Sequence, residues 1–462
     1  MQKEKRMIAV DPSDYFNENY LIDYFNNHIR RKKGGGRDNL TPEKFWKRYK
    51  DEINDIATKC LEGNYKFSSY NEKLVLKGSH KYPRVLSIPS IRDRLVLGVL
   101  NDYLSQIFAD CVNHEAPNSL IDKVRSHLES EQGNTSFLRT DFHDFYGSIR
   151  IKLLMNILSS RISNYKILEL IHSAITTSTT GKSQKCPICC SQKIGIPQGL
   201  AISNILSAIY MHSFDKEFGK NAAKIYIRYV DDILFLSPRR SSLKNAMLKE
   251  IKQRNLRLRL SPEKCKEGII GKDSLDFIGY TIGNKIFIRK KNVTNFLNRV
   301  SGLAARCKNE YENKFCRPQF ISEDSQVVDF YIEEFNLLIS GFKIGKHMYG
   351  WLPYFQSITD IAALYGMDRV IKQRIMRNLP HEISDKVNSL VDTYYAIHER
   401  FGGNLVQDFD ALETISEKKN FLVRRGRLDK HKTYSDEQIT IIFDNYMDFI
   451  KKKSEQNIGV QS

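Results

Sequence analysis

Several stretches of the chain alternate between apolar and polar residues, which is the pattern of β-strands. Residues 73–95 alternate on both sides of a Gly-Ser pair and predict a β-hairpin with a basic face. Residues 136–142 predict a strand that contains Asp141 near its end, and residues 225–236 predict two strands on either side of Asp231-Asp232. We therefore expect one aspartate at a strand end and two more at the tip of a hairpin.

Other stretches carry apolar residues three or four positions apart, as amphipathic helices do. Residues 201–218 have this spacing and follow a loop that contains two glycines and a proline. A helix is also expected to begin near Ile149, with Ser148 as its cap. Residues 276–288 predict a further hairpin, and the chain after them is mostly helical in pattern.

The composition excludes several classes of protein. The chain has 462 residues, of which 41% are hydrophobic and 11% aromatic, so it has enough apolar surface for a large core. Its longest apolar runs, such as residues 205–211, are shorter than the roughly 18 residues that a membrane-spanning helix needs. The first residues contain no apolar signal-peptide core, and eight cysteines are too few and too irregularly spaced for a secreted disulfide framework. We expect a cytoplasmic protein with reduced thiols and no membrane contact.

The charge balance favours a polyanionic partner. Lys and Arg number 72 against 54 Asp and Glu, which gives a formal net charge of +18. Such an excess creates a positive field that attracts nucleic acids, and 23 Tyr and 25 Phe offer surfaces on which bases can stack. Basic segments at residues 30–33, 424–432 and 451–453 are candidates for phosphate contacts, and solvated surfaces are the alternative for each.

The predicted strands can bring acidic residues together. If the strand ending at Asp141 pairs with the hairpin of Asp231 and Asp232, the carboxylates meet at one edge of a sheet. Phosphoryl transfer uses such a group to hold two divalent metals, which neutralise a triphosphate and activate an attacking hydroxyl. Hard oxygen ligands favour two Mg²⁺ ions, with Mn²⁺ as the alternative. Taken alone, Asp231-Asp232 is an ordinary pair of turn-forming residues.

Three motifs resemble those of reverse transcriptases. The catalytic hairpin of that family is similar to RYVDDILFLS, which includes Asp231 and Asp232. Its first catalytic motif resembles FLRTDFHDFYGSI at residues 137–149, and its nucleotide-binding loop and helix resemble GIPQGLAISNILSAIY at residues 195–210. The resemblance implies an α+β fold with the right-hand arrangement of polymerases, in which fingers and a palm of antiparallel sheet plus helices accompany a helical thumb.

The resemblance also assigns roles to single residues. It makes Asp141, Asp231 and Asp232 the catalytic residues and the ligands of the two metals. Tyr146 occupies the bulky position that lies under the sugar and collides with a 2′-hydroxyl, which favours deoxynucleotides; without the motif it would be taken for a core aromatic. Gln198 and Gly199 match the central pair of the nucleotide-binding loop, although Leu200-Ala201 departs from the Ser-Pro that usually follows in the family.

Two further segments carry candidate basic residues. RVLSIPSIRDRLV, at residues 84–96, resembles the fingers motif in which an arginine and a nearby lysine hold the triphosphate. Arg84 fits the arginine, whereas Lys77 and Lys81 both fit the lysine and are alternatively solvated surface residues. RLRLSPEKCKEG resembles the segment whose lysine protonates the leaving pyrophosphate, and Lys264 is the candidate general acid.

The resemblance is strong over roughly residues 73–290 and weaker over residues 291–400. Residues 276–282 resemble the hairpin that grips the primer end, and residues 335–355 are similar in layout to the thumb of group II intron-like enzymes. The aromatic residues of that second segment are expected to pack in a core. The expected division of the chain is a basic helical region at 1–72, fingers and palm at 73–290, a helical thumb at 291–400 and a basic helical extension at 401–462.

One cysteine cluster has the spacing of a metal site. Cys186, Cys189 and Cys190 contain a CxxC pair, which is half of a tetrahedral zinc site. No second CxxC lies nearby in the sequence, so we expect a reduced thiol loop and not zinc, unless Cys265, Cys307 or a second chain supplies further ligands.

Taken together, the motifs predict an RNA-directed DNA polymerase with an RNA template, deoxynucleoside triphosphates and a DNA product. No endonuclease, protease or ribonuclease H motif is recognisable, which argues against a self-mobile element. Compact polymerases of this kind resemble the bacterial reverse transcriptases of the unknown-group and abortive-infection lineages, many of which defend against phage with a dedicated noncoding RNA. We therefore expect an antiviral defence role on a noncoding RNA.

Two alternative functions stay open. The first is an untemplated or protein-primed DNA polymerase on the same fold, and the second is a noncatalytic RNA-binding module. The sequence also leaves open a partner protein or a homo-oligomer.

Overall fold

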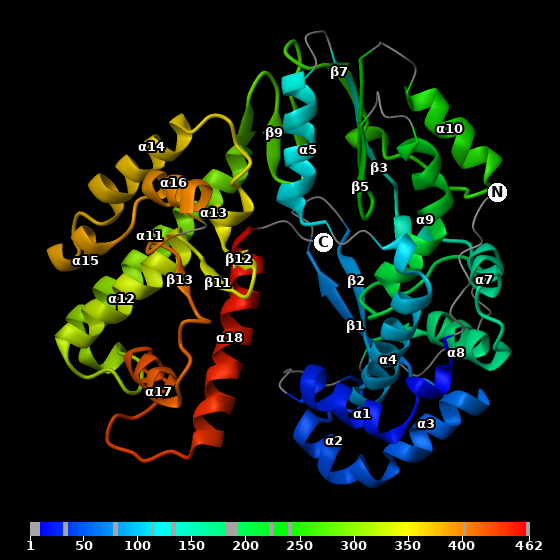
Figure 1. The fold of residues 1–462 in the computed structure, drawn as a ribbon, viewed down its shortest axis with the longest axis horizontal. Helices are drawn as coiled ribbons and strands as arrows, with labels where there is room; N and C mark the ends of the chain where they lie inside the picture. The colour runs from blue at the N-terminus through cyan, green and yellow to red at the C-terminus, as the bar shows by residue number, and fades with distance from the viewer. Residues whose placement is uncertain are drawn as a thin grey trace. The chain divides into compact units, whose positions relative to one another are not determined.

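The structure is a computed structural model in which the chain forms two compact units (Figure 1). It describes residues 10–30, 36–76, 82–112, 115–130, 135–181, 193–220, 225–238, 243–400 and 403–458. The first unit comprises Met1–His114, Leu138–Phe235 and Ser241–Cys265, and the second comprises Glu115–Phe137, Leu236–Arg240 and Lys266–Ser462. The four-segment division expected from the sequence stays a prediction.

Helices form much of the first unit. They are α1 (Glu18–Tyr24), α2 (Pro42–Tyr49), α3 (Ile53–Glu62), α4 (Ile91–Ile107), α7 (Ile151–Ser159), α8 (Tyr165–Thr176), α9 (Ser203–Gly219) and α10 (Leu243–Gln253). Helix α4 is apolar on nearly all sides and is buried over most of its length, as expected for a central helix. Ser90 caps it by accepting a hydrogen bond from the Asp93 backbone N–H at 3.1 Å.

The hairpin predicted within residues 73–95 is confirmed. Strands β1 (Tyr70–Val75) and β2 (Arg84–Ile88) pair antiparallel, with Asn71 opposite Ile88 and Val75 opposite Arg84. The connection between them, residues 77–81, lies outside the described residues, and the candidates Lys77 and Lys81 lie outside with it.

Strands β3 (Ser136–Asp141), β5 (Ile225–Tyr229) and β6 (Asp232–Ser237) confirm the other alternating segments. They lie in the order β5-β6-β3, so the strand that ends at Asp141 neighbours the strand that begins at Asp232. Helix α9 packs its Phe214 against Tyr226 of β5, with ring centroids 6.3 Å apart. The predicted helix at 201–218 is thus confirmed and supports the sheet.

Ser148 does not cap the helix that the sequence predicts near Ile149. It is instead the last residue of the short helix α6 (Phe145–Ser148), and its hydroxyl donates to the His143 carbonyl oxygen at 3.3 Å. Asp144 takes a left-handed backbone conformation with φ 43°, which turns the chain into α6 at once. Helix α7 therefore begins only at Ile151 and has no side-chain cap.

The second unit begins its C-terminal part with a small meander. Strands β8 (Leu275–Phe277), β9 (Tyr280–Ile282) and β10 (Ile286–Ile288) pair antiparallel in chain order, one strand more than the predicted hairpin needs. The other elements are α5 (Pro117–Ser130), α11 (Lys290–Glu312), α12 (Asp324–Ile339), α13 (Trp351–Tyr354), α14 (Ala362–Val370), α15 (His381–Lys386), α16 (Leu390–Arg400), α17 (Ile415–Arg424) and α18 (Asp436–Ile458), with strands β11 (Phe342–Ile344), β12 (His347–Tyr349) and β13 (Gln407–Asp408).

Aromatic residues pack this unit together, as expected for residues 335–355. Trp351 stacks on Phe296 of α11 with centroids 4.1 Å apart, and Phe355 meets Tyr280 of β9 at 5.1 Å. All four rings are buried, so they are core residues and not surfaces for base stacking. Among the described residues, no helix combines the length and the hydrophobicity that crossing a membrane requires.

Candidate active site

The first unit brings the three predicted aspartates together. Asp141 is the last residue of β3, Asp231 lies in the turn after β5, and Asp232 is the first residue of β6. The Phe142 backbone N–H, next to Asp141, donates to the Asp231 carbonyl oxygen at 3.2 Å. This bond fixes the end of β3 against the hairpin tip.

The turn that carries Asp231 is strained and braced. Val230 has a φ of 58°, a left-handed conformation that is unfavourable for a β-branched residue. The Arg228 guanidinium donates to the Val230 carbonyl oxygen at 2.8 Å and to the Asp215 carboxylate of α9 at 2.8 Å. Tyr226 also donates to Asp215, at 2.6 Å. This Arg228–Asp215 pair holds the turn in its unusual shape.

Two cationic side chains lie against the aspartates. The Lys264 ammonium forms an ion pair with Asp141. Arg139 Nη2 donates to Asp232 Oδ2 at 3.0 Å, and Asp232 Oδ1 lies at an ion-pair distance of 3.0 Å from the same nitrogen. Sequence reasoning did not assign a role to Arg139. A signal was present, because strand alternation places it on the same side of β3 as Asp141.

Burial and neighbouring negative charge disfavour the charged state of Asp231 and Asp232. Burial raises the pKa of Asp231, and the negative charge of Asp141 raises it further. The positive charges of Lys264 and Arg84 oppose that rise, which places Arg84, the first residue of β2, within electrostatic reach of Asp231. Burial likewise raises the pKa of Asp232 to about 6, against the opposing effect of Arg139.

The donor set fits a divalent cation. Asp141 Oδ1 is buried and accepts no hydrogen bond within the described part of the chain. Unsatisfied carboxylate oxygens are costly in a buried site, and hard divalent cations prefer carboxylate ligands. The residues that would hold Mg²⁺ here are Asp141, Asp231 and Asp232.

A second cluster of residues that could ligate a metal contains a carboxylate that is already paired with an arginine. Over the described residues, three ligand atoms within 4.8 Å of one another occur at Asp110, Cys111 and His212, a tighter group than the three aspartates form. Hydrogen bonds from Arg161 lower the pKa of Asp110 to about 2, and burial raises the pKa of the Cys111 thiol to about 12. The carboxylate is thus already paired and the thiol stays protonated, so we assign no metal to this group. The cluster at Cys186, Cys189 and Cys190 lies outside the described residues.

Three of the predicted nucleotide-binding residues, Tyr146, Gln198 and Gly199, belong to the same unit as the aspartates. Tyr146, in α6, donates its hydroxyl to Asn204 Oδ1 of α9 at 2.6 Å. The carbonyl oxygen of Gln198 accepts a hydrogen bond from the Ser87 backbone N–H of β2 at 2.7 Å. Gly199 follows with a φ of 104°, and a Cβ there would lie 3.2 Å from the Ser87 carbonyl oxygen, so glycine suits this close approach. Asn204 had no assigned role from the sequence.

The basic segment at residues 424–432 is engaged within the second unit. The Arg425 side chain is buried and forms an ion pair with Glu334, while Arg424 pairs with Glu333 at 3.0 Å and Lys430 with Glu323 at 3.0 Å. A phosphate contact is therefore wrong for Arg425, because its guanidinium is inaccessible.

Part of the chain is similar to a known protein family. Residues 75–282 match the model of the family described as reverse transcriptase (RNA-dependent DNA polymerase). The match and the mixture of helices and sheets confirm the expected α+β fold class of right-hand polymerases.

Two curated proteins encoded in introns are similar to the chain. An uncharacterized 91 kDa protein in the cob intron of Schizosaccharomyces pombe is 28% identical over 208 residues, which is 44% of this chain and 25% of that protein. A putative COX1/OXI3 intron 2 protein of Saccharomyces cerevisiae is 25% identical over 204 residues, which is 42% of this chain and 23% of that protein. The matches thus span about a quarter of the length of these relatives.

Solved structures of telomerase are similar at low sequence identity. Telomerase from Candida tropicalis, in complex with a fragment of telomeric RNA, has 14% identity and a TM-score of 0.43, covering 91% of this chain and 68% of that one. Telomerase from Candida albicans has 13% identity and a TM-score of 0.42, covering 75% and 68%. Residues 75–282, less than half of the chain, are thus similar to reverse transcriptase domains and distantly similar to intron-encoded proteins.

Proposed function

We propose that the chain is an RNA-directed DNA polymerase that extends DNA on an RNA template by two-metal phosphoryl transfer. The observation that carries this proposal is the meeting of Asp141, Asp231 and Asp232 inside the reverse transcriptase domain. The burial of Asp141, the raised pKa values of Asp231 and Asp232 and the unsatisfied Asp141 Oδ1 are the properties of a carboxylate group that holds divalent cations.

The three aspartates act as the cation ligands in this proposal. Bound Mg²⁺, with Mn²⁺ as the alternative, supplies charge neutralisation for the triphosphate and lowers the pKa of the primer hydroxyl. Lys264 lies against Asp141 at the edge of the group, where its ammonium can give a proton to the departing pyrophosphate. Arg84, together with Lys77 or Lys81, holds the triphosphate.

The neighbouring residues select the nucleotide. Tyr146, held by Asn204, lies under the sugar and excludes a 2′-hydroxyl, so deoxynucleoside triphosphates are the substrates. Gln198 and Gly199 form the loop beneath the incoming nucleotide, and their contact with β2 joins that loop to the strand of Arg84.

The proposal extends to a biological role. The motifs resemble those of bacterial reverse transcriptases from defence-associated lineages, and we propose that the chain copies a dedicated noncoding RNA in the cytoplasm during antiphage defence. The net charge of +18 supports an RNA partner of this kind.

Sequencing of copurifying nucleic acid tests the function. The wild-type protein is compared with an Asp231→Asn, Asp232→Asn variant and with a control, Asp51→Asn, Glu52→Gln, which removes the same charge from exposed positions. One arm is treated with protease to release protein-linked DNA. DNA complementary to one bound RNA, present in the wild type and control and lost in the catalytic variant, is the expected result.

The other outcomes identify the alternatives. DNA of simple repeated sequence without a matching RNA would indicate untemplated synthesis, and DNA released only by protease would indicate protein priming. The same RNA in all samples, with no DNA in any, would indicate a noncatalytic RNA-binding module.

A further inference from the structure

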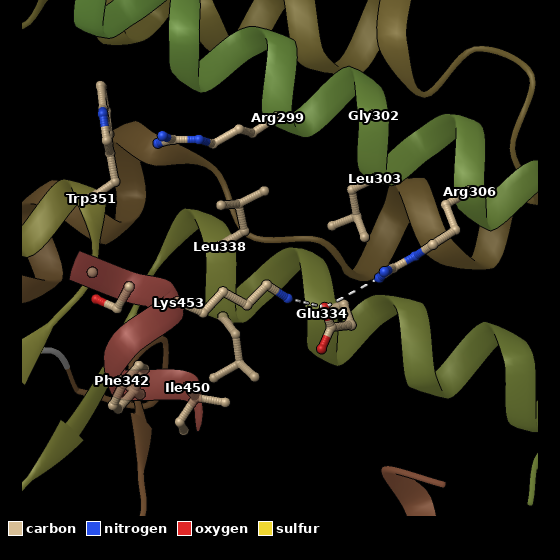
Figure 2. Close-up of a pocket in the computed structure, with 13 residues that line it drawn as sticks. Arg299, Gly302, Leu303, Arg306, Glu334, Leu338, Phe342, Trp351, Ile450 and Lys453 are labelled. Atoms are coloured by element: carbon tan, nitrogen blue, oxygen red, sulfur yellow. Dashed lines mark hydrogen bonds and ion pairs between the residues drawn. The ribbon is translucent and has the colours of Figure 1, made fainter. Parts of the chain in front are cut away.

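A cavity of about 260 Å³ lies within the second unit among helices α11, α12 and α18 (Figure 2). One face of α11 lines it with Arg299, Gly302, Leu303 and Arg306; Gly302 and Leu303 lie three and four positions after Arg299, and Arg306 follows three positions after Leu303. None of the proposed polymerase residues contributes to it.

The cavity wall has an excess of positive charge. Arg299, Arg306 and Lys453 line it against a single carboxylate, that of Glu334. Figure 2 shows Arg306 and Lys453 reaching Glu334 from α11 and α18, with nitrogen–oxygen distances of 3.5 and 2.8 Å. Glu334 also pairs with the buried Arg425, while Glu310 and Glu333 lie 3.8 and 3.5 Å from Arg306 and Arg425. Arg299, whose guanidinium donates to the Gln456 carbonyl oxygen at 2.7 Å, adds a further positive charge to the wall, which favours an anion in the cavity.

The rest of the wall is mostly apolar, with the Ser454 hydroxyl and one buried indole donor as its polar groups. Leu303, Leu338 and Phe342 line the cavity together with Trp351. The Trp351 indole N–H is buried and has no hydrogen-bond acceptor in the described part of the chain. A buried donor without an acceptor is unfavourable, and an occupant with an acceptor atom would satisfy it.

Gly302 leaves room for such an occupant. It lies in the middle of α11, where glycine is less favourable than alanine, yet a Cβ at this position would meet no heavy atom within 4 Å. The absence of a side chain here enlarges the cavity at the expense of helix stability.

We propose that this cavity binds a small organic anion, with an apolar ring between Leu303 and Trp351 and an anionic group beside Arg299. The class includes aromatic phosphates and carboxylates. Because the wall comes from α11, α12 and α18, an occupant links the C-terminal helix to the two others and stabilises the unit.

Titration with matched probes tests the proposal. The chain has two tryptophans, so Trp46→Phe leaves Trp351 as the single fluorescent reporter. The probes are phenyl phosphate, inorganic phosphate and phenol at equal ionic strength, which separate the ring from the charge. Phenyl phosphate should change Trp351 fluorescence in a saturable way, at a concentration at least tenfold lower than either of the others. It should also raise the midpoint of thermal unfolding of the otherwise unchanged chain.

Two substitutions and a control locate the site. Gly302→Leu fills the cavity and should abolish the response. Gly366→Leu, also in a helix and with no heavy atom within 4 Å of a built Cβ, lies outside the cavity and should keep it. Arg299→Gln should weaken phenyl phosphate binding about tenfold and leave phenol binding unchanged. This variant tests the location of the site even if Gly302→Leu does not fold. The proposal is overturned by a wild-type chain without a saturable response, by equal binding of inorganic phosphate, or by a response that Gly302→Leu and Arg299→Gln leave intact.

Discussion

Lys264 and Asp141 form an ion pair beside the other carboxylates of the proposed active site. The backbone also joins their segments, because the Ser261 N–H donates to the Asp141 carbonyl oxygen at 2.9 Å. The pair thus places a candidate proton donor directly beside a proposed metal ligand. It also compensates part of the negative charge that the three aspartates concentrate in one place.

Substitutions of Lys264 separate these two contributions. Lys264→Arg keeps the positive charge but cannot release a proton near neutral pH, whereas Lys264→Met removes both properties. Both variants should slow nucleotide addition by about 10²-fold, the lower range for general acid catalysis. Only Lys264→Met should also lower stability, because it leaves the buried Asp141 carboxylate without its cation. Rapid-mixing assays on a primed RNA template and urea unfolding measure the two effects, and a wild-type rate for Lys264→Arg would exclude the acid role.

The stability of the cation-free protein should depend on the ionisation of Asp232. Burial raises the pKa of this group from its usual 3.8 to about 6, so the folded protein holds the proton more tightly than the unfolded chain does. The resulting stability is fully present below pH 3.8 and is lost as the pH rises through about 6. Asparagine does not ionise. The free energy of unfolding is measured by urea unfolding in EDTA. Between pH 4 and pH 8, the wild type should lose about 2 kcal/mol of this free energy relative to Asp232→Asn. A pH-independent difference would contradict the assignment.

Sugar selection should depend on Tyr146 and, more weakly, on Asn204. Tyr146→Ala removes the ring that is proposed to exclude the 2′-hydroxyl, so the preference for deoxynucleotides, measured as the ratio of kcat/KM values, should fall about tenfold or more. Asn204→Ala removes only the 2.6 Å hydrogen bond that fixes the ring, and a loss of about 1 kcal/mol corresponds to a roughly fivefold fall. Tyr165→Ala, at an exposed tyrosine of α8, is the matched control and should leave the ratio unchanged. An unchanged ratio for Tyr146→Ala would exclude the role.

Local patterns were sufficient to predict the elements that carry the aspartates. Alternation over a few residues located the ends of β3 and β5, and with them Asp141 and Asp231, because a strand's period of two is visible in any short segment. The Ser148 cap was wrong because the left-handed conformation of Asp144, which starts a helix earlier, has no comparable local signature.

Partners distant in the sequence could not be predicted in the same way. The buried Arg425 forms an ion pair with Glu334, and the Tyr146 hydroxyl donates a hydrogen bond to Asn204. Each pair depends on how separate elements pack, which composition and periodicity do not encode. A run of basic residues therefore suggested phosphate contacts where Arg425 is in fact inside the protein.

The strained turn before Asp231 should depend on the Arg228–Asp215 pair. Asp215→Asn leaves the buried guanidinium without a charged partner, which should lower the free energy of unfolding by about 3 kcal/mol. It should also slow nucleotide addition at saturating nucleotide, because the same guanidinium holds the Val230 carbonyl oxygen at 2.8 Å and so sets the position of Asp231. Adding Arg228→Gln removes the uncompensated charge, and we expect this double variant to regain stability without regaining activity. Glu217→Gln, on the exposed side of α9, should leave the unfolding midpoint and the rate unchanged. If the double variant regained activity together with stability, the Arg228–Asp215 pair would contribute to stability only, and other contacts would position the turn that carries Asp231.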